Sequence, residues 1–271
     1  MTPTFLNRIA LGASTVAMLI VPLGAVRAQT NDEARLTLGI AAGYIGSRVL
    51  WDIPNQPILS RFDTRSVFHL HRETASDISI SGHATFYKGP HIGMTGEFTY
   101  VGLGNHDACI LVEDGGDEEL AAACNALKGA VGSASTTQVQ AGLVFRPLTR
   151  SFLQPYFKGM VGLAFTPTST IQTRSDYGNV GDTALILTIY KDDNWKSIRP
   201  TWTAAFGIST AASSGYQLHV EVREAWLPVG VVTSATEGQG LVPPHKTSIK
   251  NFPSILVGFD IVLEKRRGRR Y

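Results

Sequence analysis

The segment IGMTGEFTY, residues Ile92–Tyr100, alternates between two kinds of side chain. Its even positions carry Ile92, Met94, Phe98 and Tyr100 around a glycine, whereas its odd positions carry glycine, threonine and glutamate. Successive side chains of a β-strand point to opposite faces of the sheet. The period of two therefore predicts a strand with one apolar face and one polar face.

Seven further segments repeat this alternation. They lie at residues 35–50, 77–87, 136–148, 153–165, 199–209, 216–226 and 254–264. Tight turns such as Lys88-Gly89-Pro90 join three pairs of neighbouring segments, whereas connections of about 20 to 30 residues separate the other pairs. This asymmetry predicts an all-β fold, an eight-stranded antiparallel up-and-down transmembrane β-barrel with short periplasmic turns and long extracellular loops.

The amino-terminal residues predict export. Arg8 precedes the apolar run Ile9–Val21, which at about 13 residues is too short for a spanning helix of about 20. The small-residue pattern Val26-Arg27-Ala28 follows, as in a secretory signal peptide cleaved after Ala28. The predicted organisation is a signal peptide (1–28), a β-barrel (29–264) and a basic carboxyl-terminal tail (265–271).

The charges of the mature chain balance. Of the 24 basic residues, Arg8 and Arg27 leave with the signal peptide, and the remaining 22 equal the 22 acidic residues. This balance gives no indication of nucleic-acid binding. The basic tail can contact anionic lipid headgroups or an acidic partner, and a solvated charged tail is the simpler interpretation.

The alternating segments and their connections resemble the eight-stranded bacterial outer-membrane barrels, the group of the OmpA transmembrane domain, OmpX and OmpW. The resemblance covers the whole mature chain and rests on architecture. It implies location in the cell outer membrane, contact with outer-membrane lipids and lipopolysaccharide, and recognition by the barrel-assembly machinery. Such barrels usually end on an aromatic residue that closes the last strand. Here the basic segment 265–270 (KRRGRR) separates Tyr271 from Leu263, the last apolar residue of the alternating run.

A soluble, secreted, lipocalin-like binding barrel is the rival fold, with the apolar rows inside around a ligand. The one-sided loop lengths favour the membrane, as does a polar face rich in glycine, threonine, serine and glutamine. Aromatic residues also fall near the ends of the strands, as in the girdles at both membrane interfaces. They are Tyr44, Tyr100, Phe165, Trp202 and Trp226 toward the long loops, and Phe86, Phe145 and Tyr216 toward the turns.

The same alternation places ten ionisable side chains inside the barrel. They are Asp77, His83, Glu97, Arg146, Lys158, Arg199, His219, Glu221, Arg223 and Asp260. Charges in a confined lumen must pair, because an isolated charge loses its hydration without compensation. We expect a salt-bridged plug; a narrow polar path or a gate is the alternative. Eight strands leave an interior just wide enough for side chains, which argues against a general porin.

The two cysteines, Cys109 and Cys124, both fall in the second long loop. In an exported protein such a pair predicts a disulfide, worth roughly 3 kcal/mol for a closed loop of about 15 residues. Between them, Asp117 followed by Glu118 and Glu119 indicates a helical turn with an N-cap and acids in its first turn. The acids nearby do not match the spacing of a calcium-binding EF-hand loop.

No catalytic residues, cofactor or metal site are predicted. A lipid A acyl hydrolase or transferase would need histidine, serine and an acid grouped near the outer leaflet, and no lipid-facing row carries that group. His69 and His71 share one face of a strand near a loop end, where an ordinary polar rim is the simpler interpretation and a surface metal site the alternative.

The sequence thus predicts a non-enzymatic outer-membrane barrel with a structural or surface-interaction role. A narrow channel or carrier of a small apolar ligand is the alternative within the same fold. The external partner stays unidentified. One apolar stretch, Ala184–Tyr190, falls in the third long loop, and we expect it to extend the hairpin between the fifth and sixth strands; a ninth strand or a surface for a partner is the alternative.

Overall fold

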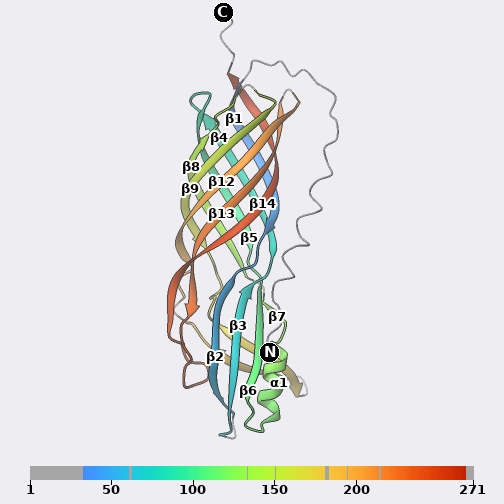
Figure 1. Ribbon diagram of the computed structural model, residues 1–271, viewed down its shortest axis with the longest axis vertical. Helices are drawn as coiled ribbons and strands as arrows, with labels where there is room; N and C mark the ends of the chain where they lie inside the picture. Colours follow the sequence, from blue (N-terminus) through green and yellow to red (C-terminus); the bar gives the residue numbers. More distant parts are fainter. Residues whose placement is uncertain are drawn as a thin grey trace, which may run out of the picture.

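A computed structural model describes residues 33–60, 63–132, 134–149, 151–180, 183–193, 195–213 and 215–266. The predicted signal peptide and residues 267–271 of the predicted tail lie outside these ranges. Eight antiparallel strands form a closed barrel in the order β1-β14-β13-β12-β9-β8-β5-β4 (Figure 1). They are β1 (Glu33–Ile45), β4 (Asp77–Tyr87), β5 (Ile92–Gly102), β8 (Ser135–Phe145), β9 (Leu153–Phe165), β12 (Ile198–Ser213), β13 (Tyr216–Val232) and β14 (His245–Arg266). The predicted fold class is confirmed.

The last strand closes the barrel against the first. β14 pairs with β1 along the length of β1, with Leu38 opposite Ile261 and Tyr44 opposite Ile255. β14 continues to Arg266, so the strand runs on into the basic segment past Leu263. This closure gives every barrel strand two hydrogen-bonded neighbours, the condition for β-structure in a bilayer.

The apolar rows face outward and the polar rows face inward. Ile40 and Val161 are 67% and 69% exposed, whereas Thr99 and Gln138 are each 2% exposed. A soluble lipocalin-like barrel requires the opposite orientation, so that alternative is wrong. Within the described residues, no helix is long and apolar enough to cross a membrane.

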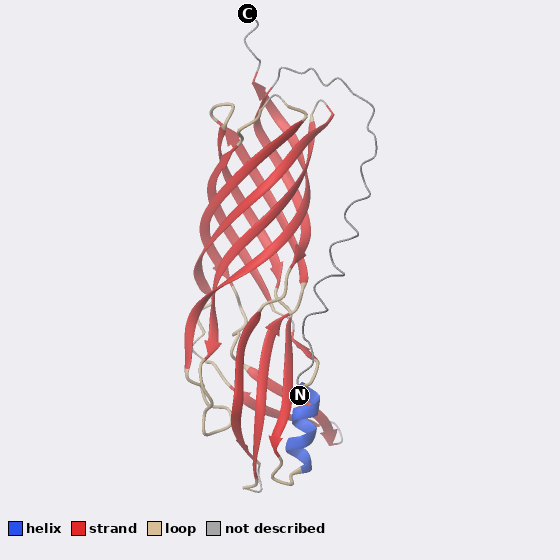
Figure 2. Cartoon of the chain, in the orientation of Figure 1, coloured by secondary structure: helices blue, strands red, loops and turns tan. Residues whose placement is uncertain are grey.

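The four long connections fold together at one end of the barrel into an extracellular lobe (Figure 2). β2 (Val49–Leu59), β3 (Arg65–Thr74), β6 (Asn105–Glu113) and β7 (Ala130–Gly132) form one sheet, and β10 (Thr173–Val180) pairs with β11 (Thr183–Tyr190). The alternation predicts no strands in the first two connections and a first strand that extends to residue 50, whereas β1 ends at Ile45 and β2, β3, β6 and β7 lie in these connections. Contrary to the prediction, the apolar stretch of the third connection does not extend the hairpin of β9 and β12 but forms β11, which pairs with β10 in a separate two-stranded sheet.

The lobe has its own hydrophobic core. Phe68, Ile58 and Leu70 are buried in its sheet and share one core with Tyr190 of β11 and Phe252 of β14. Alternate positions of β3 are buried because one face of the sheet covers this core. The connections are therefore parts of one folded unit.

A disulfide and a helix complete the lobe. Cys109 and Cys124 are bonded, with their Cα atoms 5.3 Å apart, which confirms the predicted disulfide. It joins β6 to α1 (Glu118–Leu127). Asp117 is the N-cap of this helix and accepts a hydrogen bond from the Glu119 amide at 2.9 Å, as predicted. The cap satisfies one of the amides that a helix leaves unpaired at its start.

We expect Phe68→Ala to destabilise the lobe selectively. The substitution removes a fully buried ring, and such losses cost about 3 to 5 kcal/mol. Limited proteolysis of the folded protein should then cleave the lobe, while the barrel keeps its heat-modifiable mobility on a gel. The control is Ile110→Ala, because Ile110 is exposed on the neighbouring strand. Equal protease resistance of the two variants would contradict a packed lobe.

Candidate functional site

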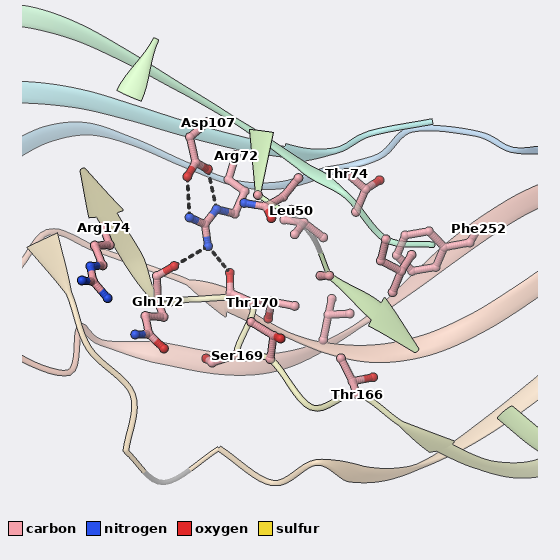
Figure 3. A pocket seen from close by; sticks show the side chains of 16 residues that line it. Leu50, Arg72, Thr74, Asp107, Thr166, Ser169, Thr170, Gln172, Arg174 and Phe252 are labelled. Atoms are coloured by element: carbon pink, nitrogen blue, oxygen red, sulfur yellow. Dashed lines mark hydrogen bonds and ion pairs between the residues drawn. The ribbon is translucent and has the colours of Figure 1, made fainter. Parts of the chain in front are cut away.

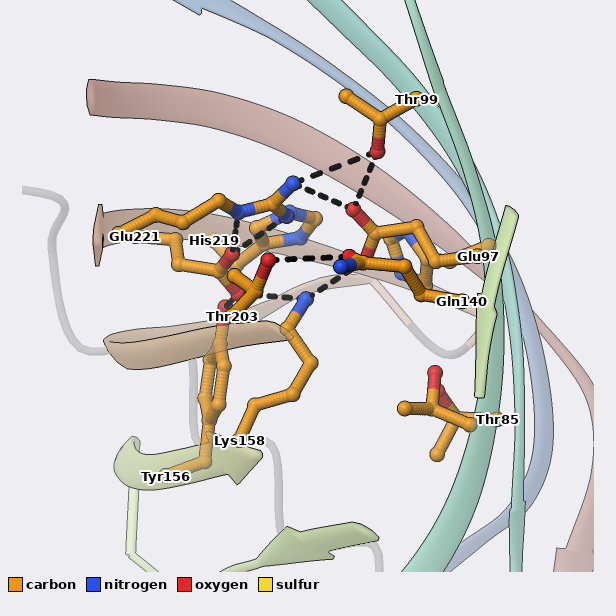
Figure 4. A network of polar contacts seen from close by, with 12 residues as sticks. Thr85, Glu97, Thr99, Gln140, Tyr156, Lys158, Thr203, His219 and Glu221 are labelled. Atoms are coloured by element: carbon orange, nitrogen blue, oxygen red, sulfur yellow. Dashed lines mark hydrogen bonds and ion pairs between the residues drawn. The ribbon is translucent and has the colours of Figure 1, made fainter. Parts of the chain in front are cut away.

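Four ionised side chains cross the middle of the lumen (Figure 4). Lys158 Nζ lies 3.0 Å from Glu97 Oε2 and 2.8 Å from Glu221 Oε2. Arg223 Nη1 lies 2.5 Å from Glu97 Oε1, and its Nη2 lies 2.7 Å from Glu221 Oε1. Two cations and two anions therefore form a closed, neutral set, which we call the lumen network.

Neutral polar groups complete the lumen network. Thr99 donates a hydrogen bond of 2.9 Å to Glu97, and the Tyr156 hydroxyl donates one of 2.9 Å to Glu221. Every member of the network is buried. Buried ion pairs are tolerated where the remaining donors and acceptors are also satisfied, as here.

A second group lies nearer the turns. His83 Nε2 is 2.8 Å from Asp260 Oδ1, and His219 Nδ1 is 3.1 Å from Asp260 Oδ2. Arg146 is also buried there, with its guanidinium 3.5 Å from the centre of the Tyr87 ring. The cavity beside these residues measures about 30 Å³, room for one or two water molecules.

Two of the ten residues predicted for the lumen lie elsewhere. Asp77 is at the loop end of β4, where its carboxylate accepts a hydrogen bond from the Ile78 amide at 2.6 Å. Arg199 is at the loop end of β12, stacks on Trp195 and donates to Thr247 at 2.9 Å. Both have the inward parity of their strands, but they sit at the level of the lobe. The prediction was wrong for these two residues because the alternation along a strand shows which face of the sheet a side chain lies on. It does not show the position of the side chain along the barrel axis.

The larger cavity, about 270 Å³, lies where the lobe meets the mouth of the barrel (Figure 3). We call it the mouth cleft. One wall is held by Arg72, whose side chain is 4% exposed and forms a two-pronged ion pair with Asp107 at 2.5 and 2.6 Å. Its Nη1 also donates to the carbonyls of Thr170 and Gln172 at 3.1 and 2.7 Å. Arg72 thus fastens the third connection to the sheet of the lobe.

The lining of the mouth cleft combines hydroxyl and amide groups with a larger apolar surface. The polar lining residues include Thr74, Asn105, Thr166, Thr168, Ser169, Thr170, Gln172 and Arg174, and the apolar ones are Leu50, Leu103, Ala134, Val229 and Phe252. None of these residues was singled out from the sequence. The run Thr166–Thr170 reads as an ordinary polar loop, and no local signal shows that it faces β3.

Comparisons with known proteins give structural likenesses alone. No family model matches the sequence, and no curated protein matches it. The crystal structure of neisserial surface protein A is 10% identical, with 86% of this chain and 100% of that chain covered and a TM-score of 0.41. OprG from Pseudomonas aeruginosa is 11% identical over 87% and 98%, with a TM-score of 0.43. AlkL in lipid bilayers is 11% identical over 90% and 96%, with a TM-score of 0.37.

Likenesses of this size carry no argument about activity, and the assignment to a membrane rests on the chain itself. The barrel is closed, its strand number is even, its turns are short at one end, and its outer surface is apolar. These are the features of bacterial outer-membrane barrels. This protein is an outer-membrane β-barrel.

His69 and His71, the pair noted in the sequence, lie on β3 at the surface of the lobe and share one acid. His69 Nε2 is 3.0 Å from Asp52 Oδ1, and His71 Nδ1 is 2.9 Å from Asp52 Oδ2. Partial burial alone raises the pKa of Asp52, but the hydrogen bonds from His71 and His69 outweigh it and hold this pKa below its usual value.

We expect the Asp52 carboxyl to titrate below pH 3.8 in the folded protein, as followed by its ¹³C chemical shift. The folded state then favours the carboxylate, so this contribution to stability is present above the ordinary pKa and is lost as the pH falls through the lowered one. The double variant H69A/H71A should raise the pKa. An unchanged titration in that variant would show that the imidazoles do not set it.

We expect Lys158→Met to lower the free energy of unfolding by about 3 to 5 kcal/mol, because it leaves two buried carboxylates sharing one guanidinium. Urea unfolding in phospholipid vesicles, followed by tryptophan fluorescence, measures the change. Lys191→Met is the matched control, since it breaks an exposed pair with Asp193 worth less than about 1 kcal/mol. If both variants unfold alike, the lumen network does not stabilise the barrel.

Proposed function

We propose that the protein is a non-conducting barrel that anchors a folded binding lobe at the cell surface. The observation that carries this proposal is the contrast between the lumen of the barrel and the mouth cleft. The lumen is filled by the paired charges of Glu97, Lys158, Glu221 and Arg223, whereas the mouth cleft is open and lined by both polar and apolar groups.

The filled lumen argues against transport through the barrel. A solute on the axis would have to separate Lys158 from Glu97 and Glu221, leaving charges unpaired in a confined space. Side chains fill the interior of an eight-stranded barrel. The role of this barrel is accordingly to hold the lobe outside the membrane.

The lobe has the properties of a recognition surface. Its core is buried, its disulfide ties β6 to α1, and Arg72 fastens its sheet to the third connection. A site held in this way loses little conformational freedom when it binds a ligand. Ligand cavities also occur preferentially where two folded units meet, and the mouth cleft lies at such a junction.

The polar part of the lining of the mouth cleft favours a small, hydroxylated, negatively charged ligand. The exposed hydroxyl of Thr168 and the exposed amide of Gln172 can exchange hydrogen bonds with the hydroxyls of a sugar, whereas the Ser169 hydroxyl already donates to Asp192 at 2.9 Å. Arg174 is exposed on β10 and reaches the cleft (Figure 3). It forms no ion pair with any side chain in the described ranges, so its guanidinium is available to a carboxylate. A sugar acid, as found in surface polysaccharides, combines these features.

We expect galacturonic acid oligomers to bind the folded protein more tightly than neutral galactose oligomers, as measured by isothermal titration calorimetry. Arg174→Ala should weaken binding of the acidic oligomers by about tenfold or more, which corresponds to one charge-assisted contact. Arg65→Ala is the control, because Arg65 is an exposed arginine of the lobe that does not line the cleft. Equal loss in both variants, or no binding by the wild-type protein, would contradict the proposed ligand class.

We expect the wild-type protein to give no single-channel openings in planar bilayers. The double variant E97A/R223A removes one charge of each sign from the lumen network and should give small, stable openings. Heat-modifiable mobility verifies that both proteins are folded. Openings in the wild-type barrel would contradict a non-conducting anchor and favour the narrow channel instead.

A further inference from the structure

His83, His219 and Asp260 converge in the lumen in a geometry that filling the barrel with paired charges does not require. One ligand atom of each residue lies within 4.8 Å of those of the other two. We propose that these three residues form a binding site for a divalent transition metal of the zinc class inside the barrel. This inference is independent of the proposed binding function of the lobe.

The barrel wall brings the three side chains together. Asp260 is on β14, His219 is on the adjacent β13, and His83 is on β4, which β1 separates from β14. Glycines stand where the rings lie against the wall: a methyl group at Gly39 would collide with Asp260 and His83, and one at Gly258 would collide with His219. Both imidazoles thus occupy positions that the wall leaves open to them.

The donor atoms are those that zinc selects. His83 Nε2 and His219 Nδ1 both face the Asp260 carboxylate, at 2.8 and 3.1 Å, so each contact is made through a proton on the ring nitrogen. Zinc binds neutral imidazole and carboxylate at about 2.0 to 2.2 Å, usually with four ligands. A metal ion that replaces the two ring protons would need a small shift of the three side chains. These residues would supply three of its four ligands and leave the fourth coordination position free.

The surroundings supply the fourth ligand and an entry path. The adjacent cavity of about 30 Å³ has room for a water molecule, and Ser209 and Gln217 line it. Its lining also includes Thr37, Tyr87 and Val144, which lie near the turn ends of their strands. A metal ion would therefore enter from the periplasmic side, since the lumen network closes the other side.

The charges around the site do not oppose the cation strongly. Lys158 lines the same cavity, and Glu97 and Glu221 each lie within 3.0 Å of its ammonium group. Arg146 does not line the cavity; its guanidinium lies over the Tyr87 ring and donates to the Ala34 carbonyl at 3.4 Å. The Tyr156 hydroxyl donates to Glu221 and does not compete for Asp260. Bound metal would join β4, β13 and β14, and would therefore stabilise the barrel against heat.

Cobalt(II) is the probe, because it occupies zinc sites and absorbs visible light when nitrogen and oxygen ligands bind it. Full-length protein is folded in detergent micelles without an affinity tag and titrated with Co²⁺ in the H69A/H71A background, which removes the exposed histidine pair near Asp52. We expect one Co²⁺ per chain, visible absorption that Zn²⁺ abolishes, and a higher melting temperature with metal.

In the same background, His219→Asn and Asp260→Asn should each weaken Co²⁺ binding by at least about a hundredfold and abolish the thermal shift. His106→Asn is the control, since His106 lies on β6 in the lobe, and it should leave binding unchanged. Heat-modifiable mobility verifies that each variant is folded. Absence of binding in the H69A/H71A protein, or unchanged binding in folded His219→Asn and Asp260→Asn, would overturn the proposal.

Discussion

Pairing of β1 with β14 is the constraint on which the rest of the molecule depends. In hydrocarbon every backbone amide and carbonyl needs a partner, and a sheet meets that need when its two edges join. Closure also fixes which face of each strand points outward. Ile40 and Val161 then contact lipid, while the opposite rows enter a lumen too narrow for bulk water.

The narrow lumen in turn dictates how its polar residues behave. Charges that share a confined space must compensate one another, and the lumen network does so with two acids and two bases. A barrel sealed in this way leaves recognition to its extracellular end. There the four connections contribute to one hydrophobic core, so the mouth cleft has walls fixed by packing and by the Arg72–Asp107 ion pair.

Much of the barrel could be predicted because its signals are local. Alternation along each strand gives its face, the two cysteines of one loop give the disulfide, and Asp117 before two glutamates gives the helix cap. The lobe and its cleft could not be predicted in this way, since Arg72 meets Thr170 across a distance in sequence of 98 residues. Height along the barrel axis was equally hidden, because it depends on register between strands. Asp77 and Arg199 were placed in the lumen for that reason.

Orientation of the two rows on β8 tests the central claim most directly. Val139 is 51% exposed and its neighbour Gln140 is 3% exposed. Because both native cysteines are in the disulfide, a nitroxide label can be attached to a single new cysteine at either position. In lipid vesicles, we expect the label at Val139 to relax readily with oxygen and to be shielded from a water-soluble nickel complex, and the label at Gln140 to be poorly accessible to oxygen. A label at Val139 shielded from oxygen, with the one at Gln140 facing lipid, would contradict a barrel that spans the membrane in this orientation.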